Sequence, residues 1–307
     1  MAAMDFQLIL DEINDELRPQ LAHTEGQVAR YIPALARVSP QQFGIALRTC
    51  AGETAAAGDA AVPFSIQSMS KVFSLTLAIR SLDEALWDRI GREPSGTAFN
   101  SLVQLETERG IPRNPFINAG AIAVADRLVS LGDAKAELLA MLGRLCGEPV
   151  HIDAEVARSE AESGFRNTAL ANFMKAFGTL DNDVGEVLDV YFNQCAIRMS
   201  CEQMACAAGY LCRDGRHPLA GTPVLSPGQA RRVNALMLTC GTYDAAGEFA
   251  FRIGLPCKSG VGGGIVAVVP ERLTLCVWSP ALDATGNSLL GRRALELFVA
   301  KTGLSVF

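Results

Sequence analysis

The chain has 307 residues, of which 49% are hydrophobic and 20% charged, and its formal net charge is -6. This composition supports a large core, in one big domain or two lobes, and an acidic chain with scattered Lys and Arg is not expected to bind nucleic acid. Residues 1–17 lack the basic and apolar regions of a signal peptide and no apolar run reaches 18 residues, so we expect a cytoplasmic protein that spans no membrane.

The first third of the chain carries helix and hairpin signals. The patterns predict helices over residues 8–17 and 26–38, a β-hairpin from 43–50 and 54–58, and a further helix from about Ser68. Tyr31 falls in the second helix. In the helix that begins near Ser68, apolar positions cover most of the helix circumference, which predicts that this helix is buried.

The middle of the chain is predicted to be helical, and strands return near its end. Helices are expected over residues 118–131, 133–146, 167–177, 183–196, 201–211 and 226–238. Two β-rich runs, 265–269 and 273–278, are joined by a hairpin signal, and a last helix covers 286–302 with Asn287 or Ser288 as its cap.

Strands at both ends with helices between them predict an α+β fold, in which distant ends share one antiparallel sheet. We expect residues 1–67 and 226–307 to form an α/β lobe around this sheet. Residues 68–225 would form a helical lobe, and the active site would lie in the cleft between the two lobes.

The nine cysteines and three histidines say little about chemistry. An odd number of cysteines spread through apolar segments is typical of a reducing compartment. Cys201, Cys206 and Cys212 are spaced by five and six residues, which does not match zinc ligands. No two histidines are spaced to pair on a helix. No metal or other cofactor is therefore expected.

Ser68 and Lys71 form a Ser-x-x-Lys motif at the start of the buried helix. Positions i and i+3 lie on one face of a helix, so both side chains would point into the same space. A lysine whose pKa is lowered by burial can act as the base for a serine nucleophile. The motif alone is weak, because a capping serine beside a solvated lysine has the same pattern.

A second motif strengthens the interpretation. Lys258-Ser259-Gly260 lies next to the late hairpin, and Ser-x-x-Lys followed by Lys-[Ser/Thr]-Gly is the order found in penicillin-binding serine acyl enzymes. The glycine run at 262–264 lacks phosphate-loop spacing, so we expect it to permit close backbone approach.

Further segments make the sequence resemble a known family, the serine-dependent glutaminases of the β-lactamase-like fold, in a compact bacterial form. The segments are VPFSIQSMSKVF at 62–73, EPSG at 93–96, NPFINAGAI at 114–122, SE at 159–160, RN at 166–167, LDVYF at 188–192, CGTYD at 240–244, KSGV at 258–261, WSP at 278–280 and GNS at 286–288. The resemblance implies hydrolysis of L-glutamine to L-glutamate and ammonia without a cofactor. It also implies a homodimer or homotetramer.

The resemblance also implies catalytic roles. Ser68 would attack the side-chain carboxamide, and Lys71 would take its proton with help from Tyr31 or Tyr243. Whether lysine or a tyrosine relay is the general base stays open. The backbone N–H groups of Ser68 and Val261 would form the oxyanion hole.

The resemblance implies a substrate-binding set as well. Glu160 would bind the α-ammonium group, and Asn118, Asn167 and Tyr191 would bind the carboxylate and amide. Tyr243 would contact the substrate too. Without the family match, Asn118 would be a helix cap, Glu160 a solvated charge and the tyrosines structural.

The amino-acid sequence leaves three other functions as alternatives. The chain could be another acyl enzyme of the same fold, such as a β-lactamase or DD-peptidase, although those usually act outside the cytoplasm. It could also be a non-catalytic glutamine sensor, although the intact Ser68 and Lys71 argue against this. Asparagine is shorter than glutamine by one methylene, and side activity on it is left open.

Overall fold

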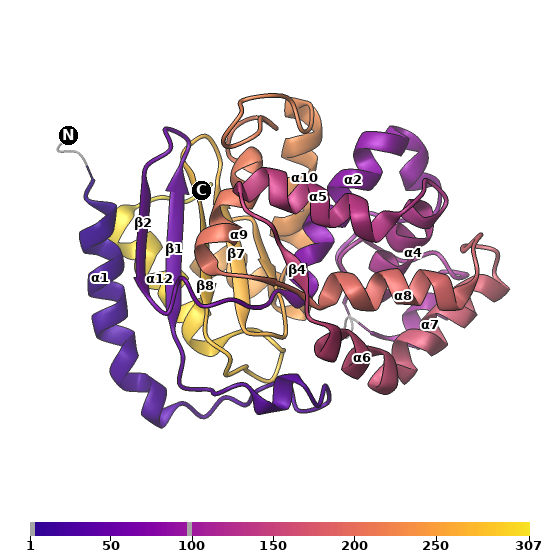
Figure 1. Ribbon diagram of the computed structural model, residues 1–307, viewed down its shortest axis with the longest axis horizontal. Helices are drawn as coiled ribbons and strands as arrows, with labels where there is room; N and C mark the ends of the chain where they lie inside the picture. The colour runs from indigo at the N-terminus through magenta and orange to yellow at the C-terminus, as the bar shows by residue number, and fades with distance from the viewer. Residues whose placement is uncertain (1–3, 97–99) are drawn as a thin grey trace.

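A computed structural model describes residues 4–96 and 100–307 of the chain. Its main sheet has five antiparallel strands in the order β2-β1-β8-β7-β6, so strands from both ends of the sequence lie side by side (Figure 1). The strands are β1 (Gly44–Thr49), β2 (Thr54–Gly58), β6 (Cys257–Ser259), β7 (Gly264–Val269) and β8 (Leu273–Trp278). The predicted α+β fold with a sheet built from both chain ends is confirmed.

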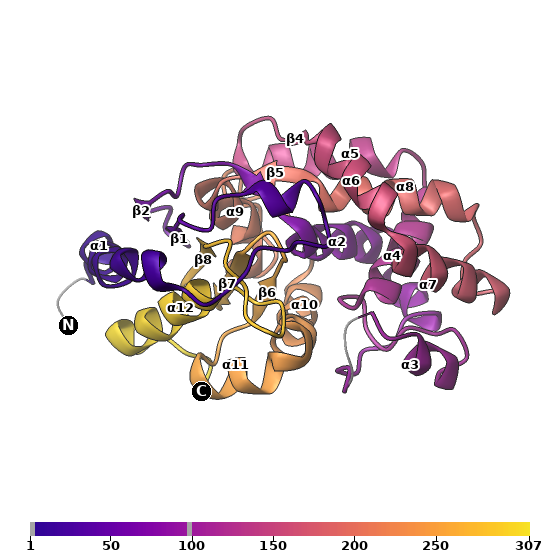
Figure 2. The same cartoon turned by 90° about the horizontal axis from the view of Figure 1, so that it is seen from below.

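The main sheet is buried on both faces. Ile45, Ala267 and Val277 point to one face, which α1 (Phe6–Leu17) and α12 (Leu289–Thr302) cover (Figure 2). Val266 and Cys276 point to the opposite face, where they join the core of the helical part of the molecule. Successive side chains of a strand point to opposite faces of the sheet, and both faces are covered. The sequences of these strands are therefore almost wholly apolar.

The rest of the chain is mainly helical, with one small sheet. The helices are α2 (Ser70–Leu82), α3 (Leu102–Thr107), α4 (Asn118–Val129), α5 (Ala134–Cys146), α6 (Ala154–Ser163), α7 (Phe165–Ala176), α8 (Val184–Cys195), α9 (Cys201–Ala207), α10 (Pro227–Cys240) and α11 (Ala246–Arg252). The small sheet has the order β3-β5-β4, from β3 (Phe64–Ser65), β5 (Ile197–Met199) and β4 (His151–Ile152). Within the described residues, no helix has both the length and the apolar character needed to cross a bilayer.

The central helix α2 is buried along most of its length, as the sequence predicted. Every residue from Ser70 to Ile79 is buried. Helices α4, α5 and α8 pack against it. The nucleophile candidate Ser68 comes just before this helix, in the 3-10 turn Gln67–Met69. The turn is therefore held by a helix that has little freedom to move.

The predicted helix over residues 26–38 is wrong. Gln27 instead pairs with Leu282 in an isolated β-bridge, and the only helical piece in the segment is the 3-10 turn Leu35–Arg37. Pro33 lies in the middle of the predicted helix, where a proline removes a backbone donor and clashes with the preceding turn. Tyr31 therefore lies in a turn.

The last helix also begins later than predicted. Ser288 is its cap and accepts a hydrogen bond from Gly291 N, while Gly286 has a φ of +87° and stays outside the helix. Helices α3, α6 and α11 and the small sheet were not predicted. The division into lobes at residues 67/68 and 225/226 stays a prediction, and residues 1–3 of the first proposed lobe and 97–99 of the second lie outside the described residues.

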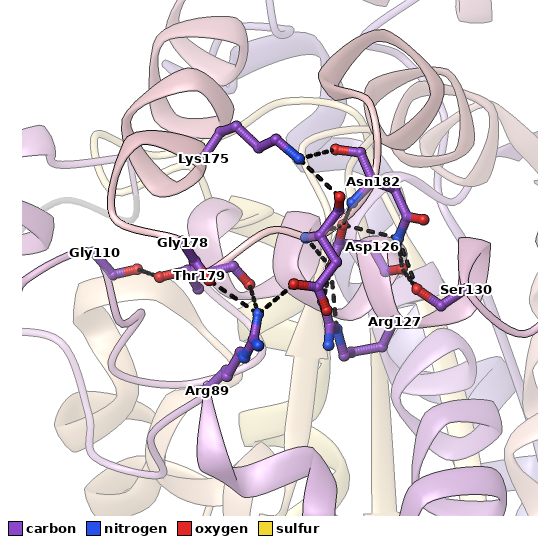
Figure 3. A network of polar contacts seen from close by, with 10 residues as sticks. Arg89, Gly110, Asp126, Arg127, Ser130, Lys175, Gly178, Thr179 and Asn182 are labelled. Atoms are coloured by element: carbon purple, nitrogen blue, oxygen red, sulfur yellow. Dashed lines mark hydrogen bonds and ion pairs between the residues drawn. The ribbon is translucent and has the colours of Figure 1, made fainter.

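A buried carboxylate joins α4 to the turn between α7 and α8 (Figure 3). Asp126 has no exposed surface, and its side chain accepts hydrogen bonds from Asp181 N, Asn182 N, Asn182 Nδ2 and Arg127. A buried charge needs this number of partners to offset its lost hydration. The network fixes the ends of helices whose other residues reach the candidate site.

Candidate active site

The turn that carries Ser68 has a strained backbone. Gln67, directly before Ser68, has a φ of +50°, which is uncommon for a residue with a side chain. The turn is held because Ser70 Oγ donates a 2.7 Å hydrogen bond to Gln67 O. Ser68 is buried yet lines a cavity of about 260 Å³. Strain of this kind at a reactive serine is typical of a site whose geometry is set in advance.

Lys71 lies one helical turn after Ser68 and is only 1% exposed. Its ammonium donates to Asn118 Oδ1 at 2.8 Å and to Phe116 O at 3.1 Å, and the ring of Tyr191 lies 5.8 Å away. Burial lowers the pKa of Lys71 to about 8, although the field of Glu160 opposes this. An amine with such a pKa is partly neutral near pH 7 and can accept a proton.

Tyr243 is the tyrosine that approaches the nucleophile. Its hydroxyl is within hydrogen-bonding reach of Ser68 and Ser259, and burial raises its pKa above the usual value. Tyr243 has a φ of +59°, a second strained position at the site. A phenol with a raised pKa stays protonated and can donate to a reacting group.

Lys258 lies behind Tyr243 and has no exposed surface. Its Nζ donates to Gly241 O at 2.9 Å and to Ser259 O at 2.6 Å, and it lies 4.8 Å from the centre of the Tyr243 ring. Burial and the charge of Lys71 lower the pKa of Lys258 well below its usual value. The strand context of Lys258 predicted a place in the cleft, but Lys258 does not line the cavity and is instead buried against Tyr243.

The glycine run after β6 packs against the nucleophile turn. A Cβ at Gly260 would lie 2.6 Å from Ile66 O and 3.2 Å from Ser68 N. A Cβ at Gly262 would lie 2.2 Å from Ser65 O. Only glycine permits this approach, and it brings Val261 to the cavity wall beside Ser68.

Glu160 is the buried acid of the cavity. It is 6% exposed, and its Oε1 is buried without a hydrogen-bond partner among the residues that the structure describes. Burial raises its pKa to about 7, against the opposing effects of a hydrogen bond from Gln67 and the charge of Lys71. A buried carboxylate oxygen that lacks a partner is suited to a cationic group of a ligand.

Most of the predicted site residues are brought together. The predicted residues that line the cavity are Tyr31, Ser68, Asn118, Glu160, Asn167, Tyr191 and Val261. Lys71 and Tyr243 do not line it, but each contacts a residue that does. Asn118 Nδ2 donates to Asn167 Oδ1 at 2.9 Å, which places two amides beside each other.

Tyr31 stands at the edge of the cavity and is 60% exposed. The segment that carries it is attached at two points: Gln27 pairs with Leu282, and Ala34 N donates to Ser159 Oγ at 3.1 Å. It therefore crosses from the segment that follows β8 to α6 and forms part of the cavity wall. Tyr31 thus faces the cavity from its edge, whereas Tyr243 is the tyrosine within hydrogen-bonding reach of Ser68.

Gln67 and Arg166 are among the cavity residues that were not predicted as site residues. Gln67 hydrogen-bonds Glu160 and donates from Nε2 to Ser65 Oγ, and no sequence signal distinguishes it from other buried glutamines. Arg166 adds an exposed cation at the cavity and donates to Asn100 Oδ1. Its place directly before Asn167 was the available signal. No cluster of three or more metal-ligating side chains occurs in residues 4–96 and 100–307.

Comparisons with known proteins agree with this geometry. A sequence model described as Glutaminase matches residues 26–307. The chain is 58% identical to a glutaminase of Rhizobium rhizogenes over 99% of both chains, and 57% identical to one of Sinorhizobium fredii over 100% of this chain and 98% of that one.

Solved structures show the same relationship. A probable glutaminase of Bacillus subtilis superposes with a TM-score of 0.90 at 37% identity, covering 98% of this chain and 97% of the other. A probable glutaminase from Bacillus subtilis complexed with 6-diazo-5-oxo-L-norleucine superposes with a TM-score of 0.88 at 36% identity, covering 100% and 99%. Full-length similarity in both sequence and structure leads to one conclusion: the chain belongs to the glutaminase family.

Proposed function

We propose that this enzyme hydrolyses L-glutamine to L-glutamate and ammonia through a γ-glutamyl ester on Ser68. The observation that carries the proposal is the unpartnered Oε1 of Glu160 in the same cavity as Ser68. An α-amino acid amide has one cationic group for this carboxylate and one carbonyl carbon for the serine. The relatives named glutaminase support the same reaction.

Substrate binding is assigned to one charged and several neutral groups. Glu160 binds the α-ammonium group, and this contact should lower the pKa of the carboxyl once the ligand is bound. The paired amides of Asn118 and Asn167 and the hydroxyl of Tyr191 bind the α-carboxylate and the side-chain amide. The neutral groups mainly orient the substrate. The buried ion pair between Glu160 and the α-ammonium group contributes most of the binding free energy.

In acylation, Ser68 Oγ bonds to the carboxamide carbon while its proton passes to neutral Lys71. The oxyanion that forms is stabilised by the N–H groups of Ser68 and Val261, which the glycine approach brings to the same side of the cavity. Tyr243 donates a proton to the leaving nitrogen and is reprotonated from Lys71, so ammonia leaves with the proton that Ser68 lost. Tyr31 borders the entrance to the cavity.

In deacylation, water replaces ammonia and attacks the γ-glutamyl ester. Its proton passes to Lys71, the ester bond breaks, and Lys71 returns the proton to Ser68 Oγ. Glutamate leaves and the enzyme is restored. Lys258 takes no proton in this scheme, since its two carbonyl contacts serve to hold the strand and turn behind Tyr243.

We also propose a cytoplasmic location and a homodimer or homotetramer. All nine cysteines are free, which suits a reducing compartment. Phe165 on α7 and Phe251 on α11 are 79% and 87% exposed, and large apolar side chains of this kind are commonly covered by another subunit. Light scattering of the purified protein tests the assembly, and a monomeric mass at micromolar concentration would reject it.

The function is tested with 6-diazo-5-oxo-L-norleucine, an amino acid that carries a diazoketone. Wild-type protein should release ammonia from glutamine. With the diazoketone it should gain the mass of the compound less dinitrogen, on a peptide that contains Ser68. Ser68→Ala should lose both properties, while Ser74→Ala, a buried change on the same helix, should keep them. Tight glutamine binding without ammonia release would identify a sensor instead.

A further inference from the structure

We propose that Cys50 and Cys212 form a peroxide-reactive dithiol, which closes reversibly to a disulfide away from the substrate cavity. The two sulfur atoms lie 3.2 Å apart in the structure. A disulfide bond is about 2.05 Å long, so closure needs an approach of roughly 1 Å. Neither residue lines the cavity that contains Ser68.

The two thiols are held close by the backbone around them. Cys50 follows β1, and its N–H donates to Arg272 O at 2.7 Å. Cys212 ends the 3-10 turn Ala208–Leu211, and its carbonyl accepts from Glu271 N at 3.0 Å. Residues 271 and 272 belong to the turn between β7 and β8. One turn therefore anchors the backbone of both cysteines.

The thiols differ in exposure and in charge environment. Cys50 is half-buried, whereas Cys212 is buried. A hydrogen bond from Cys212 and the charge of Arg213 lower the pKa of Cys50, against the opposing effects of burial, Asp214 and Glu271. An accessible thiolate with a buried partner thiol is the arrangement in which one cysteine reacts and the other resolves.

A hydroperoxide is the oxidant that converts the two thiols to a disulfide. The Cys50 thiolate attacks the peroxide oxygen, which oxidises its sulfur to a sulfenic acid and releases hydroxide or an alcohol. The Cys212 thiol then attacks this sulfur, forming the S–S bond and releasing water. Overall, two thiols lose two electrons and two protons while the O–O bond is reduced. A cytoplasmic thiol reductant reverses the change.

Cys146 and the pair Cys201 and Cys276 serve as internal controls. Cys146 is also half-buried, but burial raises its pKa and its Sγ hydrogen-bonds only backbone carbonyls among the described residues. Cys201 and Cys276 lie near each other but are wholly buried. The chain thus has another half-buried cysteine and another pair of neighbouring cysteines. Cys50 and Cys212 combine the two properties, because they are close together and one of them is partly exposed.

The test treats wild-type protein with hydrogen peroxide and analyses its tryptic peptides without reduction. A linked pair of peptides, 49–71 with 199–213, is expected, with the bond mapped to Cys50 and Cys212 and lost on adding dithiothreitol. Activity on glutamine should stay within twofold. Absence of this linked pair, or formation of a Cys201–Cys276 bond in its place, would overturn the proposal.

Two further measurements separate the roles of the thiols. In Cys212→Ser, dimedone should trap a sulfenic acid on Cys50, whereas Cys146→Ser should form the disulfide as wild type does. If the Cys212 variant does not fold, wild-type alkylation by iodoacetamide at neutral pH replaces it. Cys50 should then react at least tenfold faster than Cys146, and equal rates would reject the proposal.

Discussion

The ammonium group of Lys71 donates a 2.8 Å hydrogen bond to Asn118 Oδ1. The candidate base is thereby joined to the first residue of α4, and its second acceptor, Phe116 O, precedes the same helix. Burial lowers the pKa of Lys71, and the amide of Asn118 and the carbonyl of Phe116 supply the two acceptors for its ammonium group. A charged group in the place of that amide would change the pH dependence of the reaction.

The rate of glutamine hydrolysis should rise from acid to mildly alkaline pH. Neutral Lys71 and ionised Glu160 are both required, and their pKa values are about 8 and about 7. The fractions of neutral Lys71 and of ionised Glu160 both increase with pH. The value of kcat/KM should therefore climb steeply from pH 6 and level off above about 8.5. Initial rates of ammonia release across this range measure the effect.

Asn118→Asp should move the profile of kcat to higher pH. A carboxylate next to Lys71 favours the ammonium form, which raises its pKa by about one unit or more. The rising limb measured at saturating glutamine should shift by the same amount. An unshifted limb would assign the proton transfer to a group other than Lys71.

Glu160→Gln should weaken substrate binding far more than it slows turnover. The change removes the charge that meets the α-ammonium group, and losing one partner of a buried pair costs about 2–5 kcal/mol, so KM should rise at least about 30-fold. Glu155→Gln on the same helix breaks only an exposed pair with Arg37 and should change KM less than twofold. Similar KM values for the two variants would remove Glu160 from the site.

Gly260→Ala should disrupt catalysis without unfolding the protein. The new Cβ would lie 2.6 Å from Ile66 O, which forces the turn before Ser68 away from Val261. Displacements of about 1 Å at a reacting group can cost roughly 100-fold in rate. Gly247→Ala in α11 meets no atom within 4 Å and is the control that should keep full activity. Far-UV circular dichroism should be unchanged in both.

Asp126→Ala should destabilise the fold by about 3–5 kcal/mol, because the N–H groups of residues 181 and 182 and the Arg127 cation lose their buried partner. Urea unfolding measures the loss. Asp189→Ala removes an exposed ion pair with Lys135 and should change stability by less than about 0.5 kcal/mol. Comparable losses in both variants would contradict the role given to the network.

Local patterns predicted the elements that carry strong periodicity or turn signals. The hairpin of β1 and β2, the buried α2 and the helices α4, α5 and α8 were all found. Residues 26–38 contain helix-forming side chains, yet Pro33 and the pairing of Gln27 with Leu282 prevented the helix. Such pairing is a tertiary contact and leaves no local signal.

The candidate site was likewise predicted from local patterns only in part. The Ser-x-x-Lys spacing predicted that Ser68 and Lys71 would point into the same space, and the family resemblance implied that Val261 lies beside Ser68. The partners of Lys71 and the hydrogen bond between Gln67 and Glu160 depend on how α4 and α6 pack around the cavity. Helix α6 was not predicted, because its sequence is polar and gives no sign that Glu160 is buried.

The close approach of the Gly260–Gly262 loop to the Ser65–Ser68 turn also governs when the enzyme becomes active. The turn precedes the loop that completes the cavity by almost 200 residues, and β1 cannot pair with β8 before residues 273–278 have been made. Pairing between such distant strands is a late event in folding. A chain still being translated therefore lacks a finished site until residues 260–278 have been made.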